Sequence, residues 1–118
     1  MCGVAGFWAP GRDIADGRAT LVAMTDAIRH RGPDADGHWC DEAAGLYLGH
    51  RRLAILDLTA AGSQPMMSGS QRYVISFDGG IYNFEDIRKE LSLDGVRFRG
   101  QSDTEVLLTA IKKYLEPA

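Results

Sequence analysis

Cys2 is the residue whose type and position most directly suggest chemistry, because it immediately follows Met1. Its side chain is small, so removal of Met1 by an aminopeptidase would leave a free α-amine on Cys2. One residue would then supply both a thiol nucleophile and a base, which is the arrangement of an N-terminal nucleophile. An α-amine has a pKa of about 7.7–8.0, which suits proton transfer near neutral pH. Taken alone, a cysteine at this position is weak evidence, since most such residues have no catalytic role.

Five short motifs along the chain give Cys2 a context. They are MCGVAG at 1–6, HRGPD at 30–34, HRRLAILDL at 50–58 followed by QPM at 64–66, FDGGIYNF at 77–84, and SDTEV at 102–106. Together they resemble the motifs of class II glutamine amidotransferases. The HRGPD form is similar to the asparagine-synthetase branch of that family. The matches occur in the family's order over almost the whole chain, so coincidence is not a serious explanation.

The resemblance implies the fold of N-terminal-nucleophile hydrolases, in which stacked antiparallel sheets are flanked by helices. It also implies hydrolysis of the glutamine side-chain amide to glutamate and ammonia through a thioester on Cys2. Residues 1–118 would then be the N-terminal portion of the glutaminase domain, a partial domain. The synthetase domain that receives the ammonia would be absent from this chain. ATP and Mg²⁺ are expected only in that domain, so this segment is expected to need no cofactor.

Three residues are expected at the reaction centre by the same resemblance. Cys2 matches the nucleophile that attacks the amide carbon, and its own amine shuttles the proton. Gly79 matches the residue whose backbone N–H helps to form the oxyanion hole. Asp78 stands where the family has an asparagine whose amide donates to the oxyanion. Because an ionised aspartate only accepts hydrogen bonds, we expect glutaminase activity well below that of the family.

Three further residues are expected to bind glutamine. Arg52 matches the arginine that holds the α-carboxylate, a role that suits a guanidinium because it can bind a carboxylate bidentately. Asp103 matches the aspartate that holds the α-ammonium, and Gly80 stands where the family has a glutamate that contacts this ammonium. Without the resemblance, Arg52 would be interpreted as a solvated arginine at a strand end. Asp103 would be interpreted as an acid that the helix dipole favours.

Arg31 and Asp34 of the HRGPD motif are predicted to support the site. They either order the pocket beside Cys2 or only fasten their own loop, and neither role is catalytic. The three histidines, at positions 30, 38 and 50, are dispersed along the chain. Each is interpreted as a core or surface residue, and we predict neither a triad nor a metal site among them.

The composition bounds the class of protein. A chain of 118 residues predicts one domain, and 45% hydrophobic with 25% charged residues is typical of a soluble globular protein. A net charge of -3 without a long basic run argues against nucleic acid as a partner. No apolar stretch approaches the length of a membrane span, and the N-terminus lacks the pattern of a signal peptide. We therefore expect no membrane partner and a cytoplasmic location.

The elements that must position these residues are predicted from apolar spacing. Residues 3–8 are short and apolar and predict a buried strand. Apolar residues at helical spacing predict a helix over 18–29, with Asp16 as its N-cap. The alternating pattern of 45–49 predicts a strand, and so does the segment 72–77. The two cysteines form neither a disulfide framework nor a zinc pair, so both are expected as free thiols, with Cys40 in a packing role.

Two more helices are predicted in the second half of the chain. Asn83 is the predicted N-cap of the first, which has Phe84, Ile87 and Leu91 as its apolar stripe. The second begins with a capping box at 102–105. Its apolar face consists of Val106, Leu107, Ala110, Ile111 and Tyr114.

The order of elements predicts the fold class. Residues 53–56 are apolar and predict one more strand. Since the strands are not separated by crossover helices, they should pair antiparallel in an α+β fold of layers. Cys2 should lie at the start of a central strand, with the predicted catalytic and substrate-binding residues converging on it.

Three functions remain as alternatives at the level of the sequence. The first is an enzyme, a glutaminase module that supplies ammonia to a synthetase domain. The second is a binding or regulatory module that keeps the fold but has lost catalysis. The third is a truncation product that forms homo-oligomers through uncovered sheet edges, because unpaired edges attract further strands. The sequence does not identify the ammonia acceptor.

Overall fold

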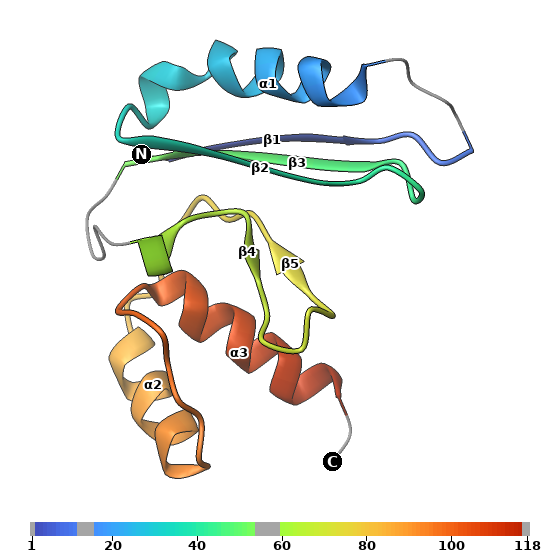
Figure 1. Cartoon of the computed structure of the whole chain (residues 1–118). Coiled ribbons are helices and arrows are strands. Elements are labelled where there is room, and N and C mark those ends of the chain that lie inside the picture. Colours follow the sequence, from blue (N-terminus) through green and yellow to red (C-terminus); the bar gives the residue numbers. More distant parts are fainter. Residues whose placement is uncertain (1, 12–15, 54–59, 117–118) are drawn as a thin grey trace.

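The computed structural model of the protein describes residues 2–11, 16–53 and 60–116. These residues form layers in the order helix, sheet, sheet and helices, with all of the sheet pairing antiparallel (Figure 1). The α+β class and the antiparallel sheets predicted from the sequence are thereby confirmed. Within the described ranges, no helix combines the length and apolar character that a membrane span requires.

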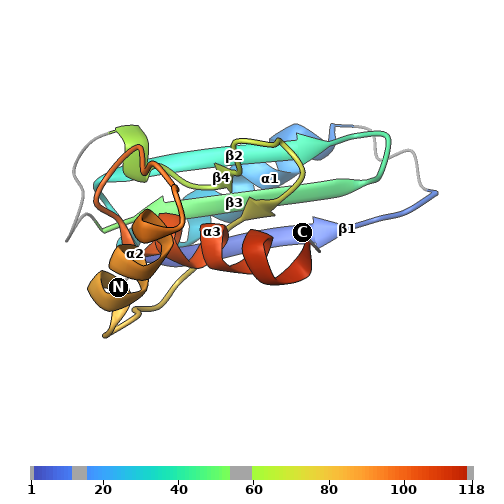
Figure 2. The same cartoon turned by 90° about the horizontal axis from the view of Figure 1, so that it is seen from below.

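The first sheet consists of three strands, β1 (Gly3–Trp8), β2 (Ala35–Asp41) and β3 (Leu46–Arg52). β3 lies between β1 and β2 and pairs antiparallel with both (Figure 2). The prediction that Cys2 begins a central strand is therefore wrong for the described sheet, in which β1 is an edge strand. β3 is central because both of its edges are hydrogen-bonded, and three consecutive residues at its end, Gly49, His50 and Arg51, are buried.

Helix α1 (Gly17–Ala27) covers one face of this sheet (Figure 1). Leu21 and Thr25 point inward from the helix and are almost fully buried. Thr25 packs directly onto Gly49 of β3, where any side chain would collide with it. On the same face, the rings of Phe7 and Tyr47 stack with their centroids 4.4 Å apart. The predicted helix over 18–29 is confirmed, although its last residues form a separate short 3₁₀ turn, η1 (Arg29–Arg31).

The opposite face of the first sheet meets a second, smaller sheet. It contains β4 (Met66–Met67) and β5 (Val74–Ile75), which follow the 3₁₀ turn η2 (Ala60–Gly62). The predicted strand over 72–77 is thus longer than the strand observed. It ends after Ile75 because the N–H of Phe77 donates to the side chain of Gln64, at 2.7 Å, instead of to a neighbouring strand. The strand predicted at 53–56 lies mostly outside the described residues.

Helices α2 (Phe84–Leu93) and α3 (Asp103–Leu115) form the last layer (Figures 1 and 2). The stripe predicted for α2 is buried at Leu91 and half-buried at Phe84 and Ile87. In α3, Val106 and Leu108 are buried, whereas Tyr114 is 76% exposed. The apolar face predicted for α3 is therefore wrong at Tyr114 and omits Leu108. The helix packs against β5 and α2 on two sides, so its inward surface is broader than a single stripe.

Of the three residues predicted as N-caps, Ser102, Asp16 and Asn83, Ser102 alone makes a capping hydrogen bond through its side chain to the described part of its helix. The side chain of Ser102 accepts a hydrogen bond from the N–H of Glu105, at 3.2 Å, as predicted. Among the described residues, Asp16 and Asn83 occupy N-cap positions but accept no capping hydrogen bond through their side chains. Asp16 has a left-handed φ of 64° and Asn83 has φ −103° and ψ 27°, whereas a capping side chain needs an extended backbone.

Cys2 and Cys40 are both half-buried, and both are free thiols.

Candidate active site

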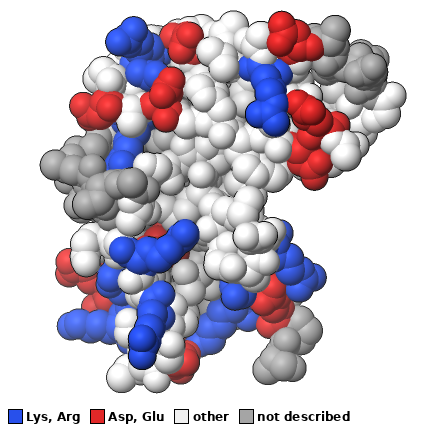
Figure 3. All heavy atoms as spheres, in the orientation of Figure 1, with Lys and Arg blue, Asp and Glu red and all other residues white. Residues whose placement is uncertain are grey.

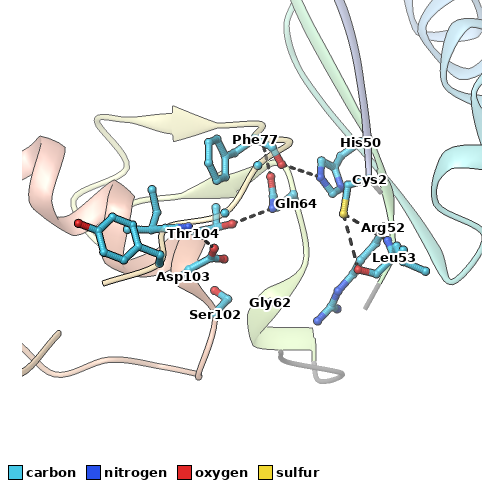
Figure 4. A pocket seen from close by; sticks show the side chains of 14 residues that line it. Cys2, His50, Arg52, Leu53, Gly62, Gln64, Phe77, Ser102, Asp103 and Thr104 are labelled. Carbon is cyan, nitrogen blue, oxygen red and sulfur yellow. Dashed lines mark hydrogen bonds between the residues drawn. The ribbon is translucent and has the colours of Figure 1, made fainter. Parts of the chain in front are cut away.

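A pocket of about 470 Å³ lies between the end of β3, the segment before α2 and the start of α3 (Figure 4). This volume falls within the range of about 300–1,000 Å³ that is usual for small-molecule sites. Its walls come from segments that are far apart in the sequence. The residues that line it are Cys2, His50, Arg52, Leu53, Gly62, Gln64, Phe77, Gly79, Gly80, Ile81, Tyr82, Ser102, Asp103 and Thr104.

Cys2 directly precedes β1 and lines the pocket. Its sulfur lies 3.3 Å from the backbone N of Leu53, which donates to it, and 3.6 Å from the Leu53 carbonyl (Figure 4). These two contacts hold the thiol beside the end of β3, because β1 and β3 pair antiparallel and Gly3 lies opposite Arg51. The register of the first sheet therefore places the nucleophile of the sequence prediction next to Arg52.

Arg52 and Asp103 line the pocket from opposite sides (Figure 4). Arg52 is the last residue of β3, and Asp103 is the first residue of α3. A guanidinium on one wall and a carboxylate on the other match the two charges of an amino-acid zwitterion. Asp103 also accepts a hydrogen bond from the N–H of Ile81, at 3.1 Å, so it holds the segment that precedes α2 as well.

Gly79 and Gly80 lie on the same wall as Asp103. The ring of Phe77 covers Gly79 so closely that a Cβ there would come within 2.8 Å of it. At Gly80 the space is open, and the nearest atom to an added Cβ is Asp103 Oδ2 at 4.0 Å. Glycine at 79 thus leaves room for the Phe77 ring, and glycine at 80 leaves the space beside Asp103 open.

Asp78 is paired with Arg31 and is not among the residues that line the pocket. The Arg31 guanidinium lies 2.9 Å from Asp78 Oδ2 and donates through Nε to the carbonyl of Cys2, at 3.0 Å. Arg31 thus connects the backbone of Cys2 to Asp78, the residue before Gly79. Of the residues predicted from the sequence, the described pocket wall includes Cys2, Arg52, Gly79, Gly80 and Asp103, and omits Arg31, Asp34 and Asp78.

The HRGPD loop is fastened to the end of β3. The N–H of Asp34 donates to the carbonyl of Arg52, at 3.0 Å, and Arg51 donates through Nε to the carbonyl of Gly32, at 2.9 Å. Gly32 fits against the backbone of Arg51 and Arg52 because it has no side chain. The loop therefore helps to place Arg52, and Arg31 within it reaches Cys2.

His50, Gln64 and Thr104 also line this site, although none of them was predicted from the sequence. His50 is 1% exposed, and its Nε2 lies 3.1 Å from the carbonyl oxygen of Phe77. Burial lowers the pKa of His50 below its usual value, and Arg52 lowers it further, against the opposing effects of the Phe77 carbonyl and Asp78. His50, Gln64 and Thr104 all lie within the family motifs, so the sequence did contain a signal for them. No spacing between a single histidine, glutamine or threonine and another polar residue distinguished them as members of a site.

In the part of the chain that the structure describes, no group of three or more His, Cys, Asp or Glu side chains is arranged to hold a metal ion. The side chains that line the pocket include a thiol, a guanidinium and a carboxylate. The fold is an α+β fold with antiparallel sheets. Its pocket combines a thiol with side chains of both charges, which is the class of site that suits a small charged molecule.

The chain belongs to the glutamine amidotransferase domain family, whose family model matches residues 1–116. It is 42% identical over 120 residues to asparagine synthetase (glutamine-hydrolyzing) 1 of Bacillus subtilis, and the aligned region covers 100% of this chain and 18% of that protein. It is 34% identical over 114 residues to asparagine synthetase (glutamine-hydrolyzing) 1 of Arabidopsis thaliana, covering 97% of this chain and 19% of that protein. It is also 34% identical over 123 residues to amidase chry2 of Gibberella zeae, covering 97% of this chain and 18% of that protein. The chain thus spans about a fifth of the length of these relatives.

Proposed function

We propose that this chain is a glutaminase module that hydrolyses the side-chain amide of glutamine to glutamate and ammonia, with Cys2 as the nucleophile. The observation that supports this most directly is the shared pocket, in which a thiol and a guanidinium lie on one wall and a carboxylate lies on the opposite wall. The family and the relatives, several of which are described as glutamine-hydrolyzing, support the same substrate.

Substrate binding would use the two charged walls. Arg52 would hold the α-carboxylate of glutamine, and Asp103 would hold its α-ammonium through the carboxylate oxygen that does not accept from Ile81. The side chain of the bound glutamine would then extend towards Cys2. This arrangement fixes the amide relative to the thiol and makes the attack effectively intramolecular.

The reaction requires that Met1 has been removed, so that the α-amine of Cys2 is free. The amine would take the thiol proton as the sulfur attacks the amide carbon, and the carbonyl electron pair would move to the oxygen. Collapse of this intermediate would form the thioester while the amine returns the proton to the departing nitrogen, which leaves as ammonia. Water would then attack the thioester, release glutamate and restore the thiol.

The negative oxygen of the intermediate needs hydrogen-bond donors. The backbone N–H of Gly79 would supply one. Asp78 cannot supply a second while it is ionised, but its pairing with Arg31 neutralises part of its charge. We therefore propose a functional but slow glutaminase.

Two wider proposals follow from the family. The described layers would be part of an N-terminal-nucleophile hydrolase fold. The ammonia would pass to an ATP-dependent synthetase domain like those of the relatives, and ATP with Mg²⁺ would belong to that domain and not to residues 1–118. Glutamine and this synthetase domain are the partners we propose.

Asp78 and Gly80 support one alternative, a module of the same fold that binds glutamine without hydrolysing it. In this case the carboxylate at 78 leaves too few donors for the oxyanion, and glycine at 80 leaves only Asp103 to face the ammonium. Calorimetry would then detect glutamine binding to a protein that releases no ammonia.

The test is ammonia release from glutamine by protein whose N-terminus has been identified as Cys2 by mass spectrometry. We expect slow turnover that Cys2→Ser abolishes. Cys40→Ser is the matched control, because Cys40 is also a half-buried free thiol but lies outside the pocket wall. Turnover that survives Cys2→Ser, or that is lost equally in Cys40→Ser, would contradict the proposal.

A further inference from the structure

We propose that His50 is a positioning residue of this site, whose imidazole holds the carbonyl of Phe77 and thereby sets the direction of the Gly79 N–H. The inference rests on the proposed function in one respect, namely that Gly79 donates to the reacting oxygen. The hydrogen bonds that carry it are drawn in Figure 4.

His50 connects the two layers of the molecule at the pocket. It projects from β3 in the first sheet, while Phe77 lies just after β5 in the second. Because a carbonyl oxygen can only accept, the Nε2 of His50 must carry the proton that it shares with Phe77 across 3.1 Å. His50 is 1% exposed, so removal of this donor would leave the carbonyl without its partner from β3 or shift it.

The N–H on the other side of Phe77 is held as well. Gln64 accepts from it through Oε1, at 2.7 Å, and donates through Nε2 to the hydroxyl of Thr104, at 3.0 Å. Thr104 itself is 4% exposed at the start of α3. Phe77 is therefore clamped between β3 on its carbonyl side and α3 on its amide side.

This clamp determines the geometry at Gly79 because few torsions separate the two. Peptide units are planar, so only φ and ψ of Asp78 lie between the Phe77 carbonyl plane and the plane that contains the Gly79 N–H. The side chain of Asp78 is held in turn by Arg31, at 2.9 Å. Beyond Gly80, the N–H of Ile81 is fixed by Asp103, at 3.1 Å. His50 is the one of these anchors that acts from β3, the strand that also ends at Arg52 and Leu53.

A neutral imidazole suits this task. The charged groups that act on His50 are Asp78, which follows β5, and Arg52, which lies two residues further along β3, while the thiol of Cys2 lines the same pocket. Burial disfavours the imidazolium and lowers the pKa of His50. The donor therefore holds its position without adding a charge beside the substrate ammonium.

The experiment compares His50→Leu, which removes the donor but keeps an apolar volume, with His50→Gln, whose amide nitrogen can reach the same carbonyl. Ser76→Ala is the matched control, since Ser76 also joins this segment to β3, donating to the Gly49 carbonyl at 3.0 Å. The first measurement is the amide nitrogen and proton shift of Gly79 in ¹⁵N-labelled protein. The second is kcat and KM for glutamine. Thermal melts check that each variant is folded.

We expect His50→Leu to move the Gly79 amide resonance and to lower kcat by up to about a hundredfold with little change in KM, because small displacements of catalytic groups have effects of this size. His50→Gln should restore both measurements towards wild type, and Ser76→Ala should leave both nearly unchanged. An unmoved Gly79 resonance in folded His50→Leu, or equal effects of His50→Gln and His50→Leu, would overturn the inference. Should the wild type release no ammonia while the resonance responds as expected, the proposed glutaminase function fails and the positioning role of His50 stands.

Discussion

Arg31 makes two contacts whose combination changes the chemistry expected of Asp78. It donates to the carbonyl of Cys2 and to the carboxylate of Asp78, and so bridges the nucleophile and the residue beside the oxyanion position. The sequence alone indicated an unpaired carboxylate that would repel the oxyanion. The ion pair reduces this repulsion, but it does not turn an acceptor into a donor. Under the proposed function, we therefore still expect a loss of transition-state stabilisation, although a smaller one than an unpaired charge would cause.

The first prediction concerns this missing donor. In Asp78→Asn, the amide oxygen can still accept from Arg31 while the amide nitrogen can donate towards the pocket. Gly80→Glu adds a second carboxylate for the substrate ammonium, and the space at Gly80 admits a side chain. We expect the double variant to raise kcat/KM for glutamine by at least roughly a hundredfold, the usual effect of one oxyanion donor. The measurement is the rate of ammonia release by processed protein.

The control for the first prediction is Asp26→Asn, an equal change of charge on the exposed side of α1. It should leave the rate unchanged. Brisk turnover of the wild type at neutral pH, unaffected by the double substitution, would show that Asp78 does not occupy the oxyanion position.

The second prediction concerns the protonation of His50. An unperturbed histidine has a pKa of about 6.5, and burial lowers the pKa of His50 in the folded protein. The unfolded chain then binds this proton more readily than the folded one. The stabilising effect of the neutral imidazole is thus fully present above a pH of about 6.5 and is lost as the pH falls through the folded pKa.

Urea unfolding over a series of pH values measures this effect. We expect the free energy of unfolding of the wild type to fall more steeply below a pH of about 6.5 than that of His50→Gln, which keeps a donor but does not titrate. The difference between the two proteins should be constant at higher pH. Parallel curves throughout would show that His50 takes up its proton equally in both states.

The membership of the site could be predicted from the sequence only where the motifs carry a resemblance. Cys2, Arg52 and Asp103 were expected to converge, and all of them line one pocket. Their roles in catalysis and binding stay predictions. The partner of Asp78 could not be predicted, because an ion pair between residues 31 and 78 depends on how the HRGPD loop folds against β3. The clamp on Phe77 was missed for the same reason.

At the scale of elements, the three predicted N-caps show what a residue type can and cannot decide. Ser102, Asp16 and Asn83 are all favoured capping residues. Only Ser102 has the extended backbone that directs its oxygen at the first turn, with φ −73° and ψ 146°. Glu105, its expected partner, accepts from the N–H groups of Arg99 and Gly100 instead, so it ties the preceding loop to the helix.

The third prediction tests this difference. Ser102→Ala should destabilise the protein by about 1 kcal/mol, because it leaves the N–H of Glu105 unpaired at a buried helix end. Asn83→Ala is the matched control and should be nearly neutral, since the Asn83 side chain makes no capping bond to the described part of α2. Thermal denaturation compares the two variants. A larger loss in Asn83→Ala than in Ser102→Ala would contradict the observed cap geometry.

Strand lengths show why the fold was predictable in class but not in detail. The strand at residues 3–8 was predicted with its observed bounds, because its apolar run stops at Ala9-Pro10. The segment 72–77 is richer in β-branched and aromatic residues, yet it forms only two residues of ladder. Ser76 and Phe77 are drawn out of the sheet by bonds to Gly49, His50 and Gln64. Tertiary contacts of this kind override local propensity, and no local pattern records them.

At the scale of the whole molecule, the chain is more extended than a compact domain of this length. The radius of gyration is 15.1 Å, compared with about 13.5 Å expected for a compact domain of this size. Figure 3 shows a recess between the part that holds α1 with the first sheet and the part that holds α2 and α3, with few charged residues at its middle. On the face of β1 that points away from α1, Val4 is 47% and Trp8 67% exposed. Part of an inner sheet face is therefore uncovered.

The last prediction follows from this uncovered face. Val4 and Trp8 lie on the first sheet, and Tyr114 and Leu115 add exposed apolar surface on α3. Apolar surface next to an edge strand favours association with another chain. We expect the protein to self-associate as its concentration rises, and light scattering at a series of concentrations measures this. Trp8→Lys should shift the equilibrium towards the monomer, because it places a charge on the edge strand. Val22→Ser, which removes a 40% exposed apolar residue from the outer side of α1, should not change it. A monomer at every concentration, with a cooperative melt at high temperature, would show that the sheet face is stable in water without a partner.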